Sequence, residues 1–138
     1  MAKALNMAAA VAAFNAEIAV FAKALMPKKF VAFHKKIALD ALRGIVMRTP
    51  VDTGRARANW QVTIDVAPED VVDEKDGGGG ATISKGIGEL NSLRPYRVVW
   101  ITNNVPYIGE LENGSSTQAP GGMVAVTLTG MRNMFALD

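Results

Sequence analysis

The first 48 residues carry apolar side chains at helical spacing. From residue 3 to residue 25, the larger apolar residues are spaced alternately four and three apart, and alanine fills most other positions. This spacing aligns them along one helix face. They are Met7, Val11, Phe14, Ile18, Phe21 and Leu25. Pro27 is expected to break or kink this helix and can open the next, because proline has no N–H to donate. A second helix is predicted over 27–48, before Pro50.

The remainder of the chain predicts short strands and helices. Apolar and polar residues alternate from Trp60 to Val66, which is typical of a half-buried strand. The β-branched stretch from Tyr96 to Thr102 is expected to be a central strand. Further helices are expected over 83–90, from Pro106 to Glu112, and over 123–136. The predicted fold class is therefore α+β, with long N-terminal helices, a small antiparallel β-sheet and a closing C-terminal helix.

Two regions differ in composition. Residues 1–26 form an alanine-rich helix that could serve as an assembly arm, and residues 27–138 form a single α+β domain. The first helix carries few charges on its alanine face, which favours contact with neighbouring subunits; packing on its own domain is the alternative. In the second region, acidic residues run into Gly77–Gly80, so we expect a flexible loop at 67–80.

The residue composition excludes several kinds of chemistry. The chain has no cysteine and a single histidine, His34. Disulfides, thiolate metal sites and cysteine nucleophiles are excluded, and an imidazole metal site or a histidine triad is disfavoured. The acidic loop lacks the alternating ligand spacing of a calcium loop. We therefore expect no metal and no cofactor.

Charge is distributed unevenly between the two halves of the chain. Residues 1–60 contain ten Lys or Arg and three acidic residues, and residues 61–138 contain five and ten. Such a subunit could stack head to tail, although each half could equally be solvated locally. The basic half could contact DNA phosphates without sequence specificity, since no reading motif or aromatic stacking pattern accompanies it. No uninterrupted apolar run approaches about 18 residues, so no membrane partner is expected.

The tripeptide Asp52-Thr53-Gly54 matches the core of the aspartic protease signature. In a homodimer, two such loops would bring two carboxylates together to share a proton. The surroundings differ from that site, because Pro50 precedes the tripeptide and Arg55 follows it. The alternative is a structural turn, in which Asp52 or Thr53 caps backbone N–H groups and Gly54 relaxes the backbone.

Two stretches of the sequence together resemble a known family. Residues 49–60 read Thr-Pro-Val-Asp-Thr-Gly-Arg-Ala-Arg-Ala-Asn-Trp. Residues 101–123 contain Asn-Asn-Val-Pro-Tyr-Ile-Gly-Glu-Leu-Glu-Asn-Gly and, further on, Gln-Ala-Pro. In this order, over about residues 28–136, the chain resembles the tail-completion, or neck, proteins of long-tailed bacteriophages. The alanine-rich first helix is not part of the shared pattern.

This resemblance implies a structural virion protein and not an enzyme. Such proteins form homo-oligomeric rings, commonly hexamers, at the head–tail junction, where the genomic DNA passes through the lumen. The implied partners are further copies of the chain, tail terminator or tube proteins, and head connector or adaptor proteins. The implied location is the neck of the virion, after assembly in the bacterial host cytoplasm. A homodimeric aspartic protease and a small non-specific DNA-binding protein remain alternative functions.

The candidate residues fall into two groups. The first is expected to shape turns or caps and comprises Asp52, Thr53, Gly54, Pro106, Tyr107 and Gly114. The second is expected to contact other subunits or partners and comprises Phe14, Ile18, Phe21, Arg55, Arg57, Glu112, Ser115, Gln118 and Pro120. Glu110 and Glu112 are expected to point in different directions, and one of them could meet an arginine such as Arg55 or Arg57.

Overall fold

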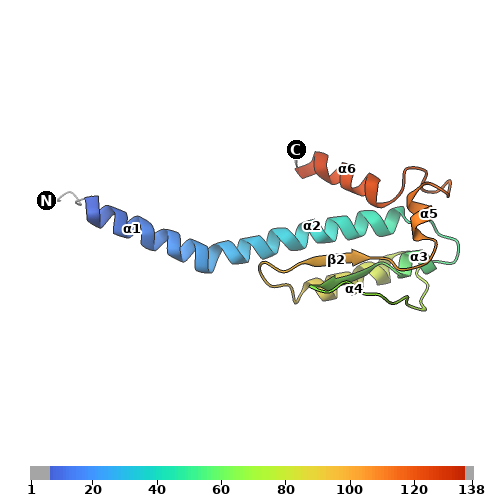
Figure 1. Cartoon of the computed structure of the whole chain (residues 1–138), viewed down its shortest axis with the longest axis horizontal. Coiled ribbons are helices and arrows are strands. Elements are labelled where there is room, and N and C mark those ends of the chain that lie inside the picture. Colours follow the sequence, from blue (N-terminus) through green and yellow to red (C-terminus); the bar gives the residue numbers. More distant parts are fainter. Residues whose placement is uncertain (1–6, 136–138) are drawn as a thin grey trace.

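The computed structural model describes residues 7–135, so the predicted helix ends at residues 3 and 136 lie outside the described residues. The α+β class is confirmed. A long helix projects far beyond a body made of the remaining elements (Figure 1). In chain order the elements are α1 (Met7–Val20), the π-helix η1 (Phe21–Leu25), α2 (Met26–Arg48), α3 (Arg55–Ala58), β1 (Gln61–Ile64), α4 (Gly80–Leu90), β2 (Val99–Thr102), α5 (Ile108–Glu112) and α6 (Val124–Phe135).

Pro27 kinks the long helix without breaking it. α1, η1 and α2 follow one another without interruption, and the helix changes direction where they meet (Figure 1). The N–H of Met26 bonds to the carbonyl of Phe21, which is the wider spacing of a π-helix. A proline ring clashes with the carbonyl four residues earlier, and the wide turn relieves that clash. The two helices predicted from the sequence are therefore one kinked helix.

The core of the body forms on the C-terminal half of α2. Its buried face consists of Ala38, Ala41, Leu42, Ile45 and Val46. α4 and α6 both contact α2, and β1 contacts α4. The other elements add further buried apolar side chains to the same cluster. They include Trp60, Val62, Leu90, Met123 and Met131.

The sheet is smaller than the sequence predicted. β1 and β2 pair antiparallel, with Val62 opposite Ile101, and they are the two strands found within residues 7–135. The strand predicted at Tyr96–Thr102 is present as β2 but begins only at Val99, and it is not central, because β1 is its one partner among the described residues. Trp100 is 43% exposed. β1 also ends two residues early, because Asp65 has a positive φ of 71° and turns the chain. Val66, expected to be inward-facing, is 74% exposed.

Gly86 allows α4 to approach both α2 and the sheet. A Cβ atom at this position would lie 2.2 Å from Cδ2 of Leu42 and 3.0 Å from Cγ2 of Val62. Gly88, two residues further along the same helix, has nothing within 4 Å of its equivalent position. The glycine at position 86 is thus a requirement of packing, whereas the one at position 88 is not.

These two glycines make a matched pair for a stability test. Gly86→Ala should lower the free energy of unfolding by about 1–3 kcal/mol, because the added methyl group overpacks Leu42. Gly88→Ala should raise it by about 0.5–1 kcal/mol, because alanine is the better helix former. Urea denaturation followed by circular dichroism measures both changes. Equal effects from the two substitutions would contradict the close packing of α4 on α2.

Candidate functional site

The two sequence stretches that carry the family resemblance meet at one cleft of about 360 Å³. One wall is the turn between α2 and α3, and the other is α5 with the loop that follows it. The lining residues are Pro50, Val51, Asp52, Thr53, Gly54, Arg55, Ala56, Tyr107, Leu111, Ser116 and Gln118. Residues separated by about half the chain therefore form one structural unit.

Gln118 fastens the two walls of this cleft together. Its side-chain oxygen accepts the N–H of Val51 at 2.9 Å, and its amide nitrogen donates to the carbonyl of Val51 at 3.1 Å. Gln118 was expected at a subunit interface. Its amide bonds within the chain, where it fixes the turn before α3, and its contact with another subunit stays a prediction.

The Asp52-Thr53-Gly54 turn leads directly into α3. The hydroxyl of Thr53 accepts the N–H of Arg55 at 3.3 Å, and Gly54 has a φ of 87°. A Cβ atom at Gly54 would lie 2.7 Å from the backbone nitrogen of Gly77, so only glycine fits without strain. Asp52 is exposed at the rim of the cleft. These three residues thus form a tight turn. The turn lies so close to the backbone of residues 76–77 that position 54 requires glycine.

Arg57 caps the C-terminal end of α2. Its guanidinium group donates to the carbonyls of Met47, Thr49 and Gly77, each at 2.9 Å. Next to it, the hydroxyl of Thr49 donates to the carbonyl of Ile45 at 2.7 Å and accepts the indole N–H of Trp60 at 2.8 Å. The C-terminal end of a helix leaves carbonyl groups without hydrogen-bond donors, and these two side chains supply the donors. The donors of Arg57 thus hold the end of α2, and the expected contact of Arg57 with other subunits stays a prediction.

Glu112 caps the N-terminus of α6. Its carboxylate accepts the N–H groups of Met123 and Val124 at 2.9 Å and of Ala125 at 3.0 Å. Burial by itself raises the pKa of Glu112, but the three N–H donors outweigh burial and hold the pKa below its ordinary value. Of the two glutamates that could have met Arg55 or Arg57, Glu112 thus uses its carboxylate on backbone N–H groups of its own chain.

The loop between α5 and α6 folds back on α5 through two glycines. Gly114 has a φ of 90°, and a Cβ atom there would lie 2.5 Å from the carbonyl oxygen of Pro120. Gly122 has a φ of 87°, and its Cβ atom would lie 2.5 Å from the carbonyl oxygen of Glu112. Gly114 therefore ends α5 in the left-handed conformation that the Asn-Gly pair predicts.

The other candidate residues of this region lie near its surface. Pro106 is exposed two residues before α5 begins, and Tyr107 is the half-buried residue that precedes the helix. Ser115 and Pro120 are exposed in the loop after α5. Ser115, Pro120 and the cleft-lining Tyr107 remain open to contact with other molecules.

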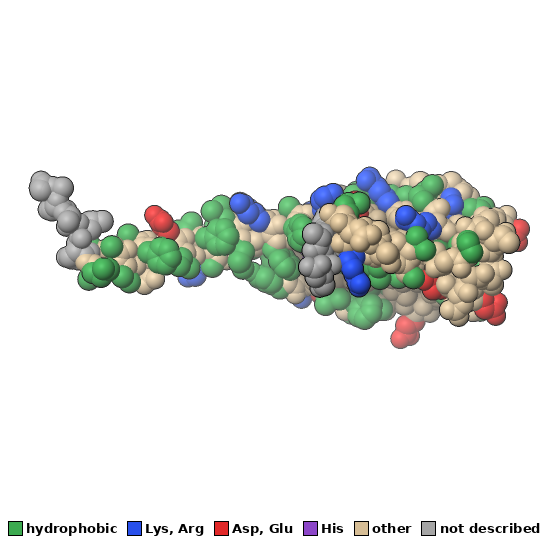
Figure 2. Space-filling view, turned by 90° about the horizontal axis from the view of Figure 1, so that it is seen from above, with side chains coloured by type: hydrophobic (Ala, Val, Ile, Leu, Met, Phe, Trp, Pro, Cys, Tyr) green, Lys and Arg blue, Asp and Glu red, His purple; other side chains and the backbone are tan. Residues whose placement is uncertain are grey.

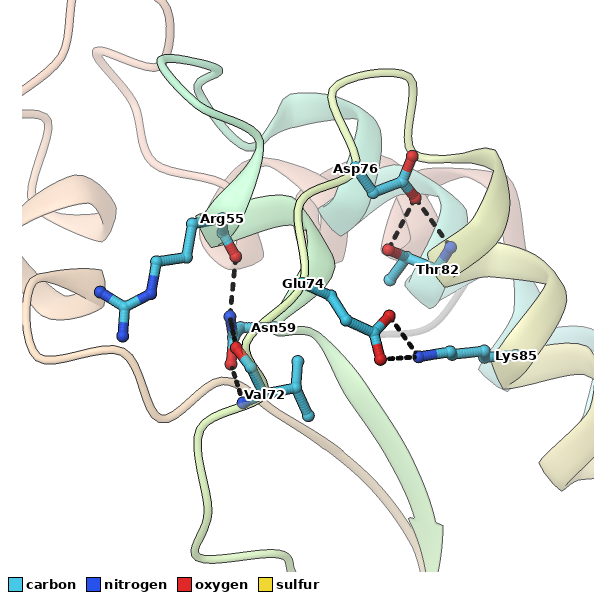
Figure 3. A network of polar contacts seen from close by, with 7 residues as sticks. All are labelled: Arg55, Asn59, Val72, Glu74, Asp76, Thr82 and Lys85. Atoms are coloured by element: carbon cyan, nitrogen blue, oxygen red, sulfur yellow. Dashed lines mark hydrogen bonds and ion pairs between the residues drawn. The ribbon is translucent and has the colours of Figure 1, made fainter.

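Asp76 anchors the end of the acidic segment to α4. Its carboxylate accepts the N–H of Gly79 at 3.0 Å. It also accepts both the N–H and the hydroxyl of Thr82, each at 2.8 Å (Figure 3). Burial raises the pKa of Asp76, but the bonds from Thr82 and Gly79 and the charge of Arg57 outweigh it, so the pKa is lowered. Gly80 is the first residue of α4, and the glycine run therefore ends in a capped helix.

Further contacts tie the acidic segment to the body. The side chain of Asn59 donates to the carbonyls of Arg55 at 2.9 Å and Val72 at 3.1 Å, and accepts the N–H of Val72 at 2.8 Å. Glu74 pairs with Lys85 at 2.7 Å (Figure 3). The segment predicted as a flexible loop at 67–80 is thus anchored at Val72, at residue 74 and at residue 76.

Asn103 and Asn104 were missed as structural residues. Asn103 donates to the carbonyl of Ala56 at 2.8 Å, and Asn104 donates to the carbonyl of Pro68 at 2.9 Å. Their position directly after β2 and before Val105-Pro106 was the available signal, since paired asparagines at a strand end are suited to bonding nearby backbone. Arg55 differs from these residues. Its side chain points away from the hydrogen bonds around Asn59 and Asp76 (Figure 3), and Arg55 lines the cleft.

The N-terminal arm, defined here as residues 7–25 of α1 and η1, is exposed at every position. Phe14, Ile18 and Phe21 are 62%, 48% and 46% exposed. Apolar side chains cover the narrow projection where it leaves the body (Figure 2). The predicted apolar seam is therefore present, and the body of the same chain does not cover it.

The long helix also meets the length and composition needed to cross a membrane. This differs from the expectation based on uninterrupted apolar runs, because the apolar stretch of the helix is interrupted only by isolated charges such as Glu17 and Lys23. One such helix near the N-terminus is weak support for a membrane span, since signal sequences and the core helices of other proteins share this length and composition. Across residues 7–135, no three acidic or histidine side chains cluster as a metal site would need.

Comparison with known proteins adds no relative to this picture. No family, no curated protein and no solved structure matches the chain.

The cap on α6 gives a pH-dependent prediction. Glu112→Gln should lower the free energy of unfolding by about 1 kcal/mol at neutral pH, because the helix loses a charged cap. A lowered folded-state pKa means that the carboxylate stabilises the protein above its ordinary pKa of 4.5, and that this contribution is lost as the pH falls through the folded-state pKa. The difference between wild type and variant should therefore shrink in acid, as measured by urea denaturation across that range.

Glu110→Gln is the control for this experiment. Glu110 is exposed on the same short helix, two residues away, and its substitution removes the same charge. It should change stability by less than about 0.5 kcal/mol. A deficit for Glu112→Gln that is the same in acid and at neutral pH would show that the carboxylate charge does not cap α6.

Proposed function

We propose that this chain is a structural subunit at the neck of a long-tailed bacteriophage, where copies form a ring that completes the tail and joins it to the head connector. The observation that carries the proposal is the arm. An apolar helical face that projects into solvent marks a surface for protein or membrane contact. A subunit whose role is assembly needs such a surface.

The construction of the body supports the same function. Gln118, Arg57, Glu112 and Asp76 all use their polar groups on backbone within the chain. They fix the turn before α3 and the ends of three helices. A body held in this way would present Arg55, Ser115 and Pro120 in defined positions to a neighbour. The two motif stretches then act as a scaffold for contact surfaces.

The proposed partners follow from this location. Copies of the chain would form the ring, and tail terminator or tube proteins and head connector proteins would lie on either side of it. Basic side chains along α2, such as Lys29 and Arg43, are exposed and could meet the phosphates of genomic DNA without sequence specificity. The proposed location is the neck of the virion, reached after assembly in the host cytoplasm.

The competing enzymatic function makes a different prediction for Asp52. In a homodimeric aspartic protease, Asp52→Asn would abolish peptide cleavage. A neck subunit would show no cleavage to lose, and the substitution should leave assembly unchanged because Asp52 is exposed at a turn.

The ring itself can be tested through the arm. The purified chain should form a closed oligomer by analytical ultracentrifugation, with a central opening in electron micrographs. Phe14→Asp should shift the distribution toward monomer, because it places a charge on the apolar seam. Native mass spectrometry of both proteins measures the shift.

Asn15→Asp provides the matched control, since it adds the same charge at the next exposed position of the arm, beside the seam. It should leave the oligomer largely intact. A chain that stays monomeric at high concentration and binds neither tail nor head connectors would overturn the proposed function.

A further inference from the structure

An apolar groove lies where the arm joins the body. This foot groove has a volume of about 380 Å³ and is lined by Pro27, Lys28, Val31, Ala32, Lys35 and Pro95. Its far wall belongs to the connection between α4 and β2. That wall is held against α2 by the rings of Phe30 and Tyr96, whose centroids are 5.2 Å apart. The groove is therefore a formed feature of the body, with two lysines beside apolar walls.

The arm has chemistry complementary to this groove. Its seam presents aromatic and aliphatic side chains, and the rest of its surface is mainly alanine, which lets another helix approach closely. Glu17 is the one acidic residue of the arm. An arm laid in a foot groove would bury seam residues against Val31 and Pro95 and would bring Glu17 toward Lys28 or Lys35.

Glu17 also distinguishes a protein occupant from a lipid one. It lies at the middle of the apolar stretch from Met7 to Met26. In a bilayer crossing, this carboxylate would sit near the centre of the hydrocarbon, where a charge is most costly. Beside two lysines, the same carboxylate is stabilised. The position of Glu17 thus favours the groove of another chain over a membrane.

We propose that the arm of one copy packs in the foot groove of a second copy, with Glu17 beside Lys28 or Lys35. This inference rests on the proposed ring and specifies one of its contacts. The arm and the groove are different surfaces of the same chain, so the contact is head to tail. Repeated from copy to copy, a contact of this kind closes into a ring when the rotation per subunit allows it.

Charge reversal tests the contact without requiring that the exact pairing of arm residues and groove residues be known. Glu17→Lys should raise the concentration for half-assembly about tenfold, because it places like charges together. Lys28→Glu combined with Lys35→Glu should do the same from the groove side. All three changes together should restore assembly toward the wild-type value. Mass photometry over a concentration series gives these values, and circular dichroism checks that each variant is folded.

Lys29→Glu is the matched control for the groove. Lys29 is exposed and adjacent to Lys28 but does not line the groove. It should shift the half-assembly concentration much less than the groove variant. The proposal is overturned if the triple variant assembles no better than Glu17→Lys alone, or if Lys29→Glu weakens assembly as strongly as the groove variant does.

Cross-linking tests whether the contact joins two chains. Because the natural chain has no cysteine, single cysteines report cleanly. A chain with Val11→Cys or Ile18→Cys, mixed with a differently tagged chain carrying Ala32→Cys, should give a mixed product with a short bis-maleimide. Replacing Ala32→Cys by Ala125→Cys, exposed on α6, should give far less.

The two proposals can fail separately in these experiments. Rings that form without any arm-to-groove product would overturn the inference and leave the neck function standing. A chain that carries both cysteines should cross-link into products larger than a dimer if the contact is head to tail. Products that stop at dimers would overturn the head-to-tail ring. A monomer that floats with phosphatidylcholine and phosphatidylglycerol vesicles through its arm would overturn both.

Discussion

The burial of the C-terminal half of α2 is the interaction on which the rest of this structure depends. Leu42 and Val46 have no exposed surface, and helices α4 and α6 both pack against the stripe that contains them. The N-terminal half of the same long helix has no comparable cover within the described chain. One helix therefore serves two purposes, since half of it organises a body and half of it extends away from that body.

The sequence predicted the helices and a small antiparallel sheet, but it missed where the strands end and predicted a central strand that the sheet does not have. Helical spacing over many residues is a strong signal, and the predicted helices at 83–90 and 123–136 are present as α4 and α6. Alternation over seven residues was a weaker signal. It predicted a strand through Val66, whereas the positive φ of Asp65 turns the chain and ends β1 earlier. The apolar run around Trp100 indicated a central strand, but no further strand pairs with it within residues 7–135. Strand pairing depends on partners that local composition does not reveal.

The sequence predicted which residues come together in the candidate site better than it predicted what each residue does there. The two motif stretches do come together, yet Glu112 and Gln118 bond to backbone of their own chain. A charged residue at the end of a short helix, such as Glu112, has the same appearance in a sequence whether it faces a partner or caps another helix. The difference arises only when a helix N-terminus is brought to it, as α6 is brought to Glu112. The arm also had two interpretations in the sequence, and the structure separates them, because no described element of the body lies over residues 7–25.

The π-helical turn between the arm and α2 has a consequence for how such a chain can change over time. A π turn holds one residue more than an α turn, so losing one residue from Phe21–Leu25 would return that turn to α-helical spacing, at the cost of the clash between the ring of Pro27 and the preceding turn. Everything before that point would then rotate by about 100° about the helix axis, while α2 and the body kept their contacts. A single insertion or deletion could therefore redirect the projecting segment toward a different neighbour, and no substitution in the folded body would be needed.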